Sequence, residues 1–193
     1  LLWLLIRQPE TLVPEDRRPL SLRAMWFATK EMFGHRTACL SIVIQTLVFA
    51  MLFAVLSSTQ QVFDITFGQA AHFHLWFGGI AIVSASASVL NALLVERLGM
   101  RAIVKAMFSA HIAMTGVMIL IWISGPPDGV IFASYIVWMT SNFFQAGLTM
   151  GNLNALGMEE MGHIAGMAAS IISAVATVGA VFLAAPVALL FDG

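Results

Sequence analysis

The sequence predicts an all-α polytopic membrane protein, and three observations indicate that fold class. Hydrophobic residues make up 60% of the 193 positions, with a mean hydropathy of +0.91. Charged residues make up 10%, well below the roughly 25% of soluble globular proteins. Five apolar runs are long enough for the roughly 20 residues that cross a bilayer. We place these spans at residues 37–57, 73–94, 102–123, 130–150 and 164–190.

The part before the first span contains a short apolar piece and a polar linker. Residues 1–6, LLWLLI, are too short to cross a membrane, and we interpret them as the end of a helix that begins outside the sequence. We therefore expect the chain to be a fragment of a longer protein. Residues 7–36 contain three prolines and are typical of a cytoplasmic linker between two bundles. Residues 20–33 fit either a helix in the headgroup layer or a continuation of the first span.

All nine Lys and Arg residues fall on one side of the predicted spans. Six lie before the first span, and three lie between the second and the third. The loops on the other side, residues 58–72 and 124–129, contain neither Lys nor Arg. Because Lys and Arg in short loops stay on the cytoplasmic side, the linker 7–36 and the loop 95–101 are predicted to be cytoplasmic.

Polar residues inside the predicted spans recur on single helix faces. Such residues are costly in a bilayer and point at partners or at a water-filled cavity. The longest stripe, in the fourth span, has steps of three and four residues: Tyr135, Trp138, Asn142, Gln145, Thr149 and Asn152. The other faces are Thr37, Ser41 and Gln45 in the first span, Phe77, Ala81, Ser84, Ser88 and Asn91 in the second, and His163, Gly166, Ser170, Ser173 and Thr177 in the fifth.

Two explanations are open for these stripes. Small residues let helices approach closely, while Asn and Gln form interhelical hydrogen bonds. We favour this packing explanation for the fifth span, where Gly, Ala and Ser dominate. In the other explanation the stripe lines a solute pathway, which we favour for the fourth span because its aromatic rings lie beside amides. The predicted pathway residues are Gln45, Ser84, Ser88, Tyr135, Trp138, Asn142 and Gln145.

The histidines and the motif content give no support to metal, cofactor or nucleic-acid chemistry. His111, in the third span, is either functional or a neutral side chain bonded to a Ser or a carbonyl on a neighbouring helix, and we favour the second. His72 and His74 are expected to be interfacial, and Glu159 and Glu160 to be solvated. CxxC, HExxH, GxSxG and phosphate-binding glycine loops are missing from the sequence, so we predict no metal, no cofactor and no enzymatic activity.

Several short motifs resemble one transporter family. The turn from Glu96 to Arg101, ERLGMR, resembles the second half of the acid-Arg-x-Gly-x-basic signature in the cytoplasmic loops of major facilitator superfamily transporters. The runs AVLSSTQQVF and GNLNALGMEEMGHIAGMAASIISAV resemble the bicyclomycin-resistance branch of drug exporters in that superfamily. QPETL, at residues 8–12, resembles the Pro-Glu-Thr that closes their sixth helix.

The resemblance implies the second half of a twelve-helix transporter. Residues 1–6 then end helix 6, and residues 37–193 form a bundle of helices 7 to 11 without the last helix. It further implies proton-coupled export of small amphipathic or apolar compounds across a bacterial inner membrane, by alternating access together with an N-terminal six-helix half.

The charged turn acquires a role from the same resemblance. Glu96, Arg97 and Arg101 are expected to brace the cytoplasmic side through salt bridges to helix ends, and Gly99 is expected to be a turn residue with positive φ. Three other functions stay open: nutrient uptake by the same fold, a membrane scaffold in which every stripe is helix packing, and an intramembrane enzyme.

Overall fold

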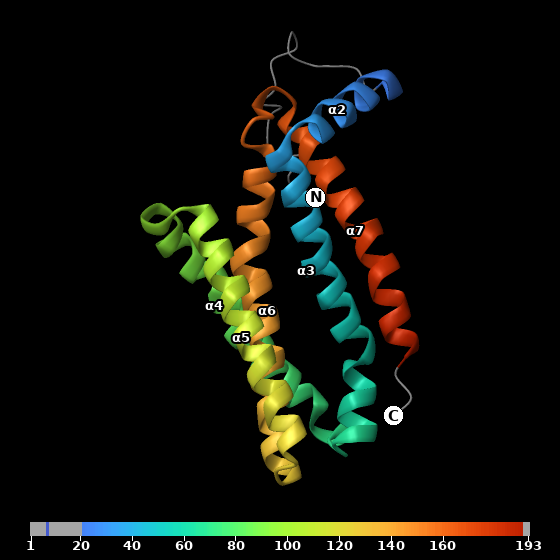
Figure 1. The fold of residues 1–193 in the computed structure, drawn as a ribbon, viewed down its shortest axis with the longest axis vertical. Helices are drawn as coiled ribbons and strands as arrows, with labels where there is room; N and C mark the ends of the chain where they lie inside the picture. Colours follow the sequence, from blue (N-terminus) through green and yellow to red (C-terminus); the bar gives the residue numbers. More distant parts are fainter. Residues whose placement is uncertain (1–6, 8–20, 191–193) are drawn as a thin grey trace.

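The computed structural model describes residue 7 and residues 21–190, and the regular elements within them are all helical (Figure 1). The predicted helix end at residues 1–6 and most of the linker lie outside the described residues. The α-helices are α2 (Leu22–Gly34), α3 (Arg36–Gln61), α4 (Phe73–Leu98), α5 (Met100–Ser124), α6 (Asp128–Met158) and α7 (Ala165–Leu189). Short turns of π- or 3₁₀-helix join some of them: η2 (Val62–Thr66), η3 (Ala70–His72) and η4 (Gly162–Ile164).

Four described helical segments are long and apolar enough to cross a membrane. They are Arg36–Thr66, Ala70–Leu98, Met100–Ser124 and Gly162–Val187. The first three contain the predicted spans 37–57, 73–94 and 102–123, and the last covers residues 164–187 of the predicted span 164–190. The other predicted span, residues 130–150, lies within α6, which does not reach the same hydropathy. Its polar stripe lowers the mean hydropathy, although the helix is long enough to cross. The all-α fold and the membrane-compatible helices are therefore confirmed for the described residues.

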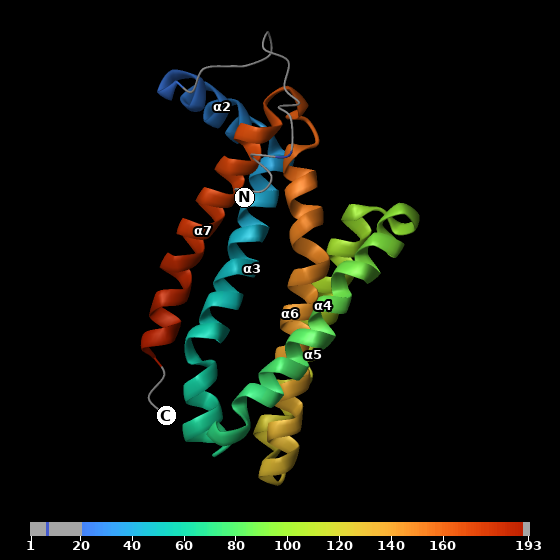
Figure 2. The same ribbon diagram turned by 180° about the vertical axis from the view of Figure 1, so that it is seen from behind.

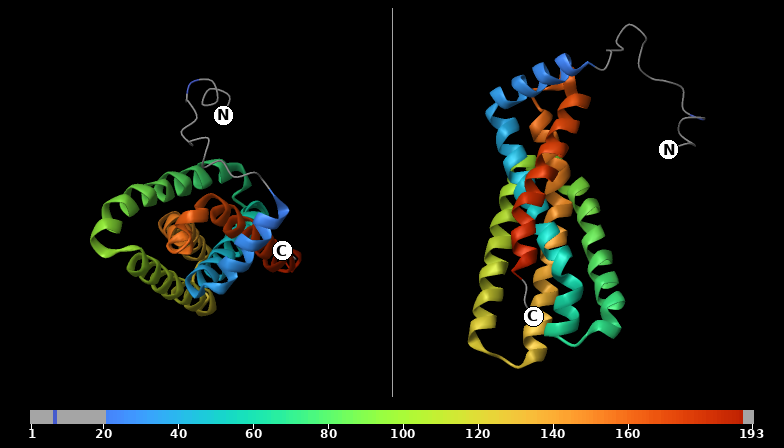
Figure 3. Two further views of the ribbon diagram at one scale, coloured as in Figure 1. Left: turned by 90° about the horizontal axis from the view of Figure 1, so that it is seen from above. Right: turned by 90° about the vertical axis from the view of Figure 1, so that its right-hand side faces the viewer.

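The polar helix α6 occupies the centre of the bundle (Figure 3). α3, α4 and α5 all pack against it, whereas α7 packs mainly on α3. Asn142, Gln145 and Thr149 of α6 consequently have no exposed surface. The neighbouring helices therefore cover the same polar residues that lower the mean hydropathy of α6.

The long helices alternate in direction, so the charges separate along the bundle. We call the end that holds α2, the turn between α4 and α5 and the end of α6 the basic end, and the end that holds the α3–α4 and α5–α6 connections the far end (Figure 1). The described bases of residues 21–190 belong to α2, the start of α3, the end of α4 and the first turns of α5. The loops at the far end carry no Lys or Arg.

Gly99 alone connects α4 to α5. Its φ of 78° and ψ of 153° lie in a region that L residues with a Cβ rarely adopt, which confirms the predicted positive φ at this turn. Gly125, at the other end of α5, is left-handed with a φ of 61° and caps that helix.

α2 is a separate helix that lies across the basic end (Figure 3). His35 has an extended backbone, with φ −98° and ψ 118°, so the chain breaks between α2 and α3 and the continuous-helix alternative is wrong. Ala28 and Met32 on one face of α2 are buried against the first turns of α3 and α7. The headgroup-layer interpretation of this helix stays a prediction.

Small residues set the closest helix contacts. A Cβ on Gly147 of α6 would lie 2.9 Å from the Cβ of Ala87 on α4, and one on Gly179 of α7 would lie 2.8 Å from Cγ2 of Thr46 on α3. The buried face of α7 repeats every four residues: Ala168, Ile172, Ala176, Ala180 and Ala184. Glycine and alanine thus bring these backbones together, as they do in other membrane bundles.

The predicted packing face of α7 is wrong. Gly166, Ser170, Ser173 and Thr177 are all exposed, and a Cβ on Gly166 would meet nothing within 4 Å. The alanine face next to it makes the contact instead. Both faces consist largely of small residues, and the alanine face, which includes Ile172, buries more apolar surface without desolvating a hydroxyl.

We expect Gly147→Ala to lower the thermal unfolding midpoint. The new methyl group meets the rigid Cβ of Ala87, and overpacking of this kind costs about 1–3 kcal/mol. Gly151→Ala is the matched control, since a Cβ there meets nothing within 4 Å on the same helix. It is expected to raise the midpoint through helix propensity, worth about 1 kcal/mol. Equal shifts for the two variants would contradict the close α4–α6 contact.

Candidate functional site

Buried polar side chains on three helices form the candidate site. We call this group the polar seam and define it as Gln45 of α3, Ser84 of α4, and Asn142 and Gln145 of α6. Gln45 is 2% exposed, and the two α6 amides are fully buried. Val48, one turn from Gln45, packs with Ala146, and the Ser84 carbonyl lies beside Gly147. The residues of α3 and α4 therefore flank the same stretch of α6.

The polar seam contains side-chain atoms that make no hydrogen bond among the described residues. These buried atoms are Gln45 Oε1, Ser84 Oγ, Asn142 Oδ1 and Nδ2, and Gln145 Oε1. A buried polar group without a partner costs about 1–3 kcal/mol. The seam is therefore an energetically unfavourable way to pack three helices.

Towards the basic end, polar side chains on the same face of α6 form hydrogen bonds. Asn152 Nδ2 donates to Asn91 Oδ1 of α4 at 2.7 Å and to the Leu148 carbonyl at 2.8 Å. Thr149 Oγ1 donates to the Gln145 carbonyl at 2.9 Å and accepts from Gln145 Nε2 at 3.3 Å. Here the amide and hydroxyl groups act as interhelical and local hydrogen-bond partners, as the packing explanation requires.

Towards the far end, the α6 stripe continues into an aromatic cluster. The Tyr135 ring lies 5.3 Å from that of Phe67, 6.1 Å from that of Phe63 and 6.0 Å from that of Trp138. Trp138 Nε1 donates to Thr115 Oγ1 of α5 at 3.0 Å. The stripe predicted from sequence therefore has three parts: paired amides, the polar seam and aromatic rings.

Phe63 and Phe67 were not among the predicted site residues, because residues 58–72 were expected to form a loop. Helix continues there as η2, and its wider π-helical turn places Phe63 in the core with no exposed surface. Phe132 of α6 contacts both rings, at 5.8 Å from Phe63 and 5.0 Å from Phe67. The signal available was the unusual presence of two Phe residues in a loop otherwise rich in Gln, Ser and Thr.

Ser88 is the predicted pathway residue that the fold does not bring inside. Its side chain is exposed, whereas Ala87, one residue earlier, is fully buried against Gly147. One residue corresponds to a rotation of about 100° on a helix, so only one of these two positions can face α6. Ser84, one turn before Ser88, is half-buried and keeps its hydroxyl inside.

His111 is held by the neighbouring helix, as the favoured explanation predicts. Its Nδ1 lies 3.1 Å from Ser141 Oγ on α6, and its ring stacks on Trp138 with centroids 6.2 Å apart. His72 and His74 are exposed near the far end. Within residues 21–190, no group of three or more His, Cys, Asp or Glu side chains is arranged to hold a metal ion.

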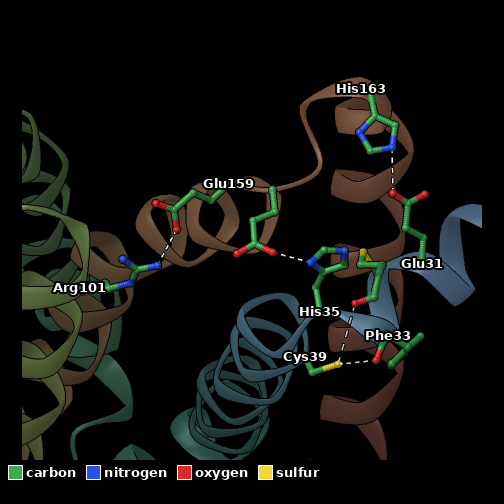
Figure 4. Close-up of polar contacts among 9 residues, drawn as sticks. Glu31, Phe33, His35, Cys39, Arg101, Glu159 and His163 are labelled. Atoms are coloured by element: carbon green, nitrogen blue, oxygen red, sulfur yellow. Dashed lines mark hydrogen bonds and ion pairs between the residues drawn. The ribbon is translucent and has the colours of Figure 1, made fainter.

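One ion pair and two histidine–carboxylate contacts connect the helices at the basic end (Figure 4). Arg101 Nη2 of α5 lies 2.6 Å from Glu159 Oε2, which follows α6. His163 Nε2 lies 2.9 Å from Glu31 Oε1 of α2. His35 Nδ1, at the corner before α3, pairs with Glu160 Oε2. Glu159 and Glu160 are exposed, as expected for solvated side chains, and the turn after α6 also brings them to bases on other elements.

The predicted charge cluster is present only in part. Arg101 forms the expected link to a helix end, whereas Glu96 and Arg97 are exposed and form no ion pair within residues 21–190. Side chains at this end are partly exposed, and exposed pairs contribute about 0–1 kcal/mol each. The basic end is thus linked by several weak interactions.

Comparisons of the chain with protein-family models, with curated proteins and with solved structures give no match. The polar seam is accordingly interpreted from its own geometry and from the motifs in the sequence. Its fully buried amides lie next to aromatic rings, and this combination suits adaptable hydrogen bonding to a compound that is otherwise apolar.

A double-mutant cycle on Arg101→Ala and Glu159→Ala is expected to give a coupling energy below about 1 kcal/mol at low salt, because both side chains are partly exposed. The coupling should vanish near 1 M salt, where the Debye length is about 3 Å. Thermal unfolding of the detergent-solubilised protein measures it. Arg97→Ala combined with Glu159→Ala is the control and should show no coupling; equal coupling in both cycles would contradict the specific pair.

Proposed function

We propose that this chain is the C-terminal bundle of a secondary transporter, resembling the major facilitator superfamily, that exports small amphipathic or apolar compounds by alternating access. The polar seam is the observation that carries the proposal. Four side chains on α3, α4 and α6 bury five polar atoms that have no hydrogen-bond partner among the described residues. Polar groups inside membrane bundles that are not paired with one another mark solute pathways.

The seam argues against a scaffold in which every polar stripe is helix packing. Asn152 and Asn91 show how packing uses amides in this bundle, with a direct hydrogen bond between two helices. Asn142 lies on the same side of α6, and neither its oxygen nor its nitrogen is paired. An apolar residue at this position would pack at lower cost. A retained amide is explained if a polar group of a solute, or water that accompanies it, becomes its partner during transport.

The aromatic cluster next to the seam supports an amphipathic solute. Tyr135 and Trp138 continue the α6 stripe towards the far end, and Phe67 and Phe132 pack edge to face beside them. Aromatic faces bind varied apolar groups, while an amide supplies both a donor and an acceptor. A compound with an apolar body and one polar group matches this succession along α6.

Direction and energy coupling in the proposal come from the sequence resemblance. The five predicted spans contain no Asp or Glu. In the proposed arrangement, the carboxylates that exchange protons therefore belong to an N-terminal six-helix half, and this bundle supplies solute contacts. The basic end is assigned to the cytoplasm of a bacterial cell because Lys and Arg in short loops stay on that side.

Replacement of Asn142 and Gln145 by Leu in the complete gene product tests the proposal. Export in inverted membrane vesicles is expected to fall by at least about tenfold, the effect of 1.4 kcal/mol of lost solute binding. The thermal unfolding midpoint should stay the same or rise, because each buried unpaired group removed had cost about 1–3 kcal/mol. Loss of export together with retained stability is the signature of a functional site.

Ser109→Leu is the control, because it also replaces a polar residue by Leu but lies on the exposed face of α5. It should leave both export and unfolding unchanged. If the double variant exports normally, the seam does not belong to the pathway. If it instead unfolds at a lower temperature than the unmodified protein, the amides serve packing and the scaffold explanation gains support.

A further inference from the structure

A wedge-shaped groove lies between α4 and α5, with α6 as its floor. α4 and α5 meet at Gly99 and diverge towards the far end on either side of α6 (Figures 2 and 3). The wedge contains a cavity of about 620 Å³ against α4 and one of about 320 Å³ that also reaches α5. Both are lined by Val83, Ile136 and Thr140, so we treat them as one continuous groove.

The groove is open near the far end and closed near the Gly99 turn. Gln69, His72 and Trp76 line the part nearest the far end. Near the Gly99 turn, a packed apolar cluster fills the space between α4 and α5: Ala87, Leu94, Val95, Ile103, Met107, Phe144 and Leu148. A helix that crosses the whole membrane therefore cannot run through the groove, whereas a shorter molecule can enter it from the far-end side.

His111 gives the apolar interior of the groove one polar group. The side chain is 8% exposed and lines the inner cavity together with Met107, Met114 and Phe144. Its Nδ1 is engaged by Ser141, whereas its Nε2 has no hydrogen-bond partner in residues 21–190. Nor does Nε2 belong to the fully enclosed unpaired atoms, so it retains accessible surface. Because the groove borders this residue, that surface faces the groove.

The hydrogen bonds around Ser141 determine which nitrogen of His111 carries the proton. Ser141 Oγ donates its hydrogen to the Trp138 carbonyl at 2.7 Å. At the 3.1 Å contact with His111, Ser141 Oγ therefore accepts, and Nδ1 of the histidine is the donor. In the neutral imidazole, Nε2 is then a free acceptor. A matching ligand group has to be a hydrogen-bond donor.

We propose that this groove binds a membrane-dissolved amphiphile that carries a single hydroxyl or amine, and that this group donates a hydrogen bond to His111 Nε2. The apolar walls accommodate the hydrocarbon body, and the volume lies in the range of about 300–1,000 Å³ typical of ligand pockets. The site uses the face of α6 that carries Ile136 and Thr140, away from Asn142, so it does not depend on the transport proposal.

Photolabelling of the complete protein in phospholipid vesicles tests the site. The probe is a long-chain alcohol with a diazirine on its chain, and its matched control is the methyl ether of the same alcohol, which cannot donate. Mass spectrometry quantifies the labelled α5 and α6 peptides. The alcohol is expected to label them about three- to tenfold more than the ether, the ratio that one hydrogen bond provides.

Variants of residues that line the groove test the hydrogen bond to His111 and the space available to the ligand separately. His111→Leu should bring the ratio to about one, and His111→Gln, whose amide oxygen still accepts, should restore part of it. Val83→Trp, at the junction of the two cavities, should abolish labelling by both probes. His74→Leu, on an exposed histidine outside the groove lining, should change nothing.

Three outcomes overturn the proposal. Equal labelling by the alcohol and the ether in the unmodified protein would mean that the groove holds bulk lipid without recognition. A ratio that survives His111→Leu would place the donor contact elsewhere. Absence of labelling by both probes would mean that a protein segment covers the groove. If His111→Leu fails to fold, the alcohol-to-ether labelling ratios of the unmodified protein and of His111→Gln still test whether His111 accepts the hydrogen bond.

Discussion

The hydrocarbon of a bilayer offers no hydrogen-bond partner to a polar side chain, and the arrangement of this bundle depends on that constraint. α6 carries the longest polar stripe, and α3, α4 and α5 cover it. In the most apolar parts of α4 and α5, by contrast, few residues are buried, and apolar side chains face outward without penalty. Polarity thus determines which helix lies in the centre. The two sides of α6 then differ in character, with amides on one and an apolar groove on the other.

Features that follow from spacing along one helix were predictable from the sequence. The spans at 37–57, 73–94 and 102–123 lie inside single helical segments, because hydrophobic length alone determines them. The burial of Asn142 and Gln145 followed from a simple rule, that polar groups avoid lipid. Gly99 was predictable because a one-residue corner between two helices requires a backbone that only glycine adopts readily.

Features that depend on contact between helices were not predictable in the same way. The sequence of α7 offers two neighbouring faces of small residues, and only the position of α3 decides that the alanine face is buried. Ser88 and Ala87 differ by one residue, and the position of Gly147 on another helix selects Ala87. Glu159 and Glu160 find Arg101 and His35 across gaps of 58 and 125 residues, which no local pattern encodes. Phe63 was missed because a π-helical turn extends α3 into an assumed loop.

The single-residue connection at Gly99 has a mechanical consequence. Consecutive Cα atoms are 3.8 Å apart, so the joined ends of α4 and α5 cannot separate, while the chain itself sets no such limit on the distance between their opposite ends. Gly99 is therefore the position of a hinge between α4 and α5, and α6 lies between the two helices. A small rotation at Gly99 would displace the far ends of α4 and α5 by several ångströms, because each helix is about 25 residues long.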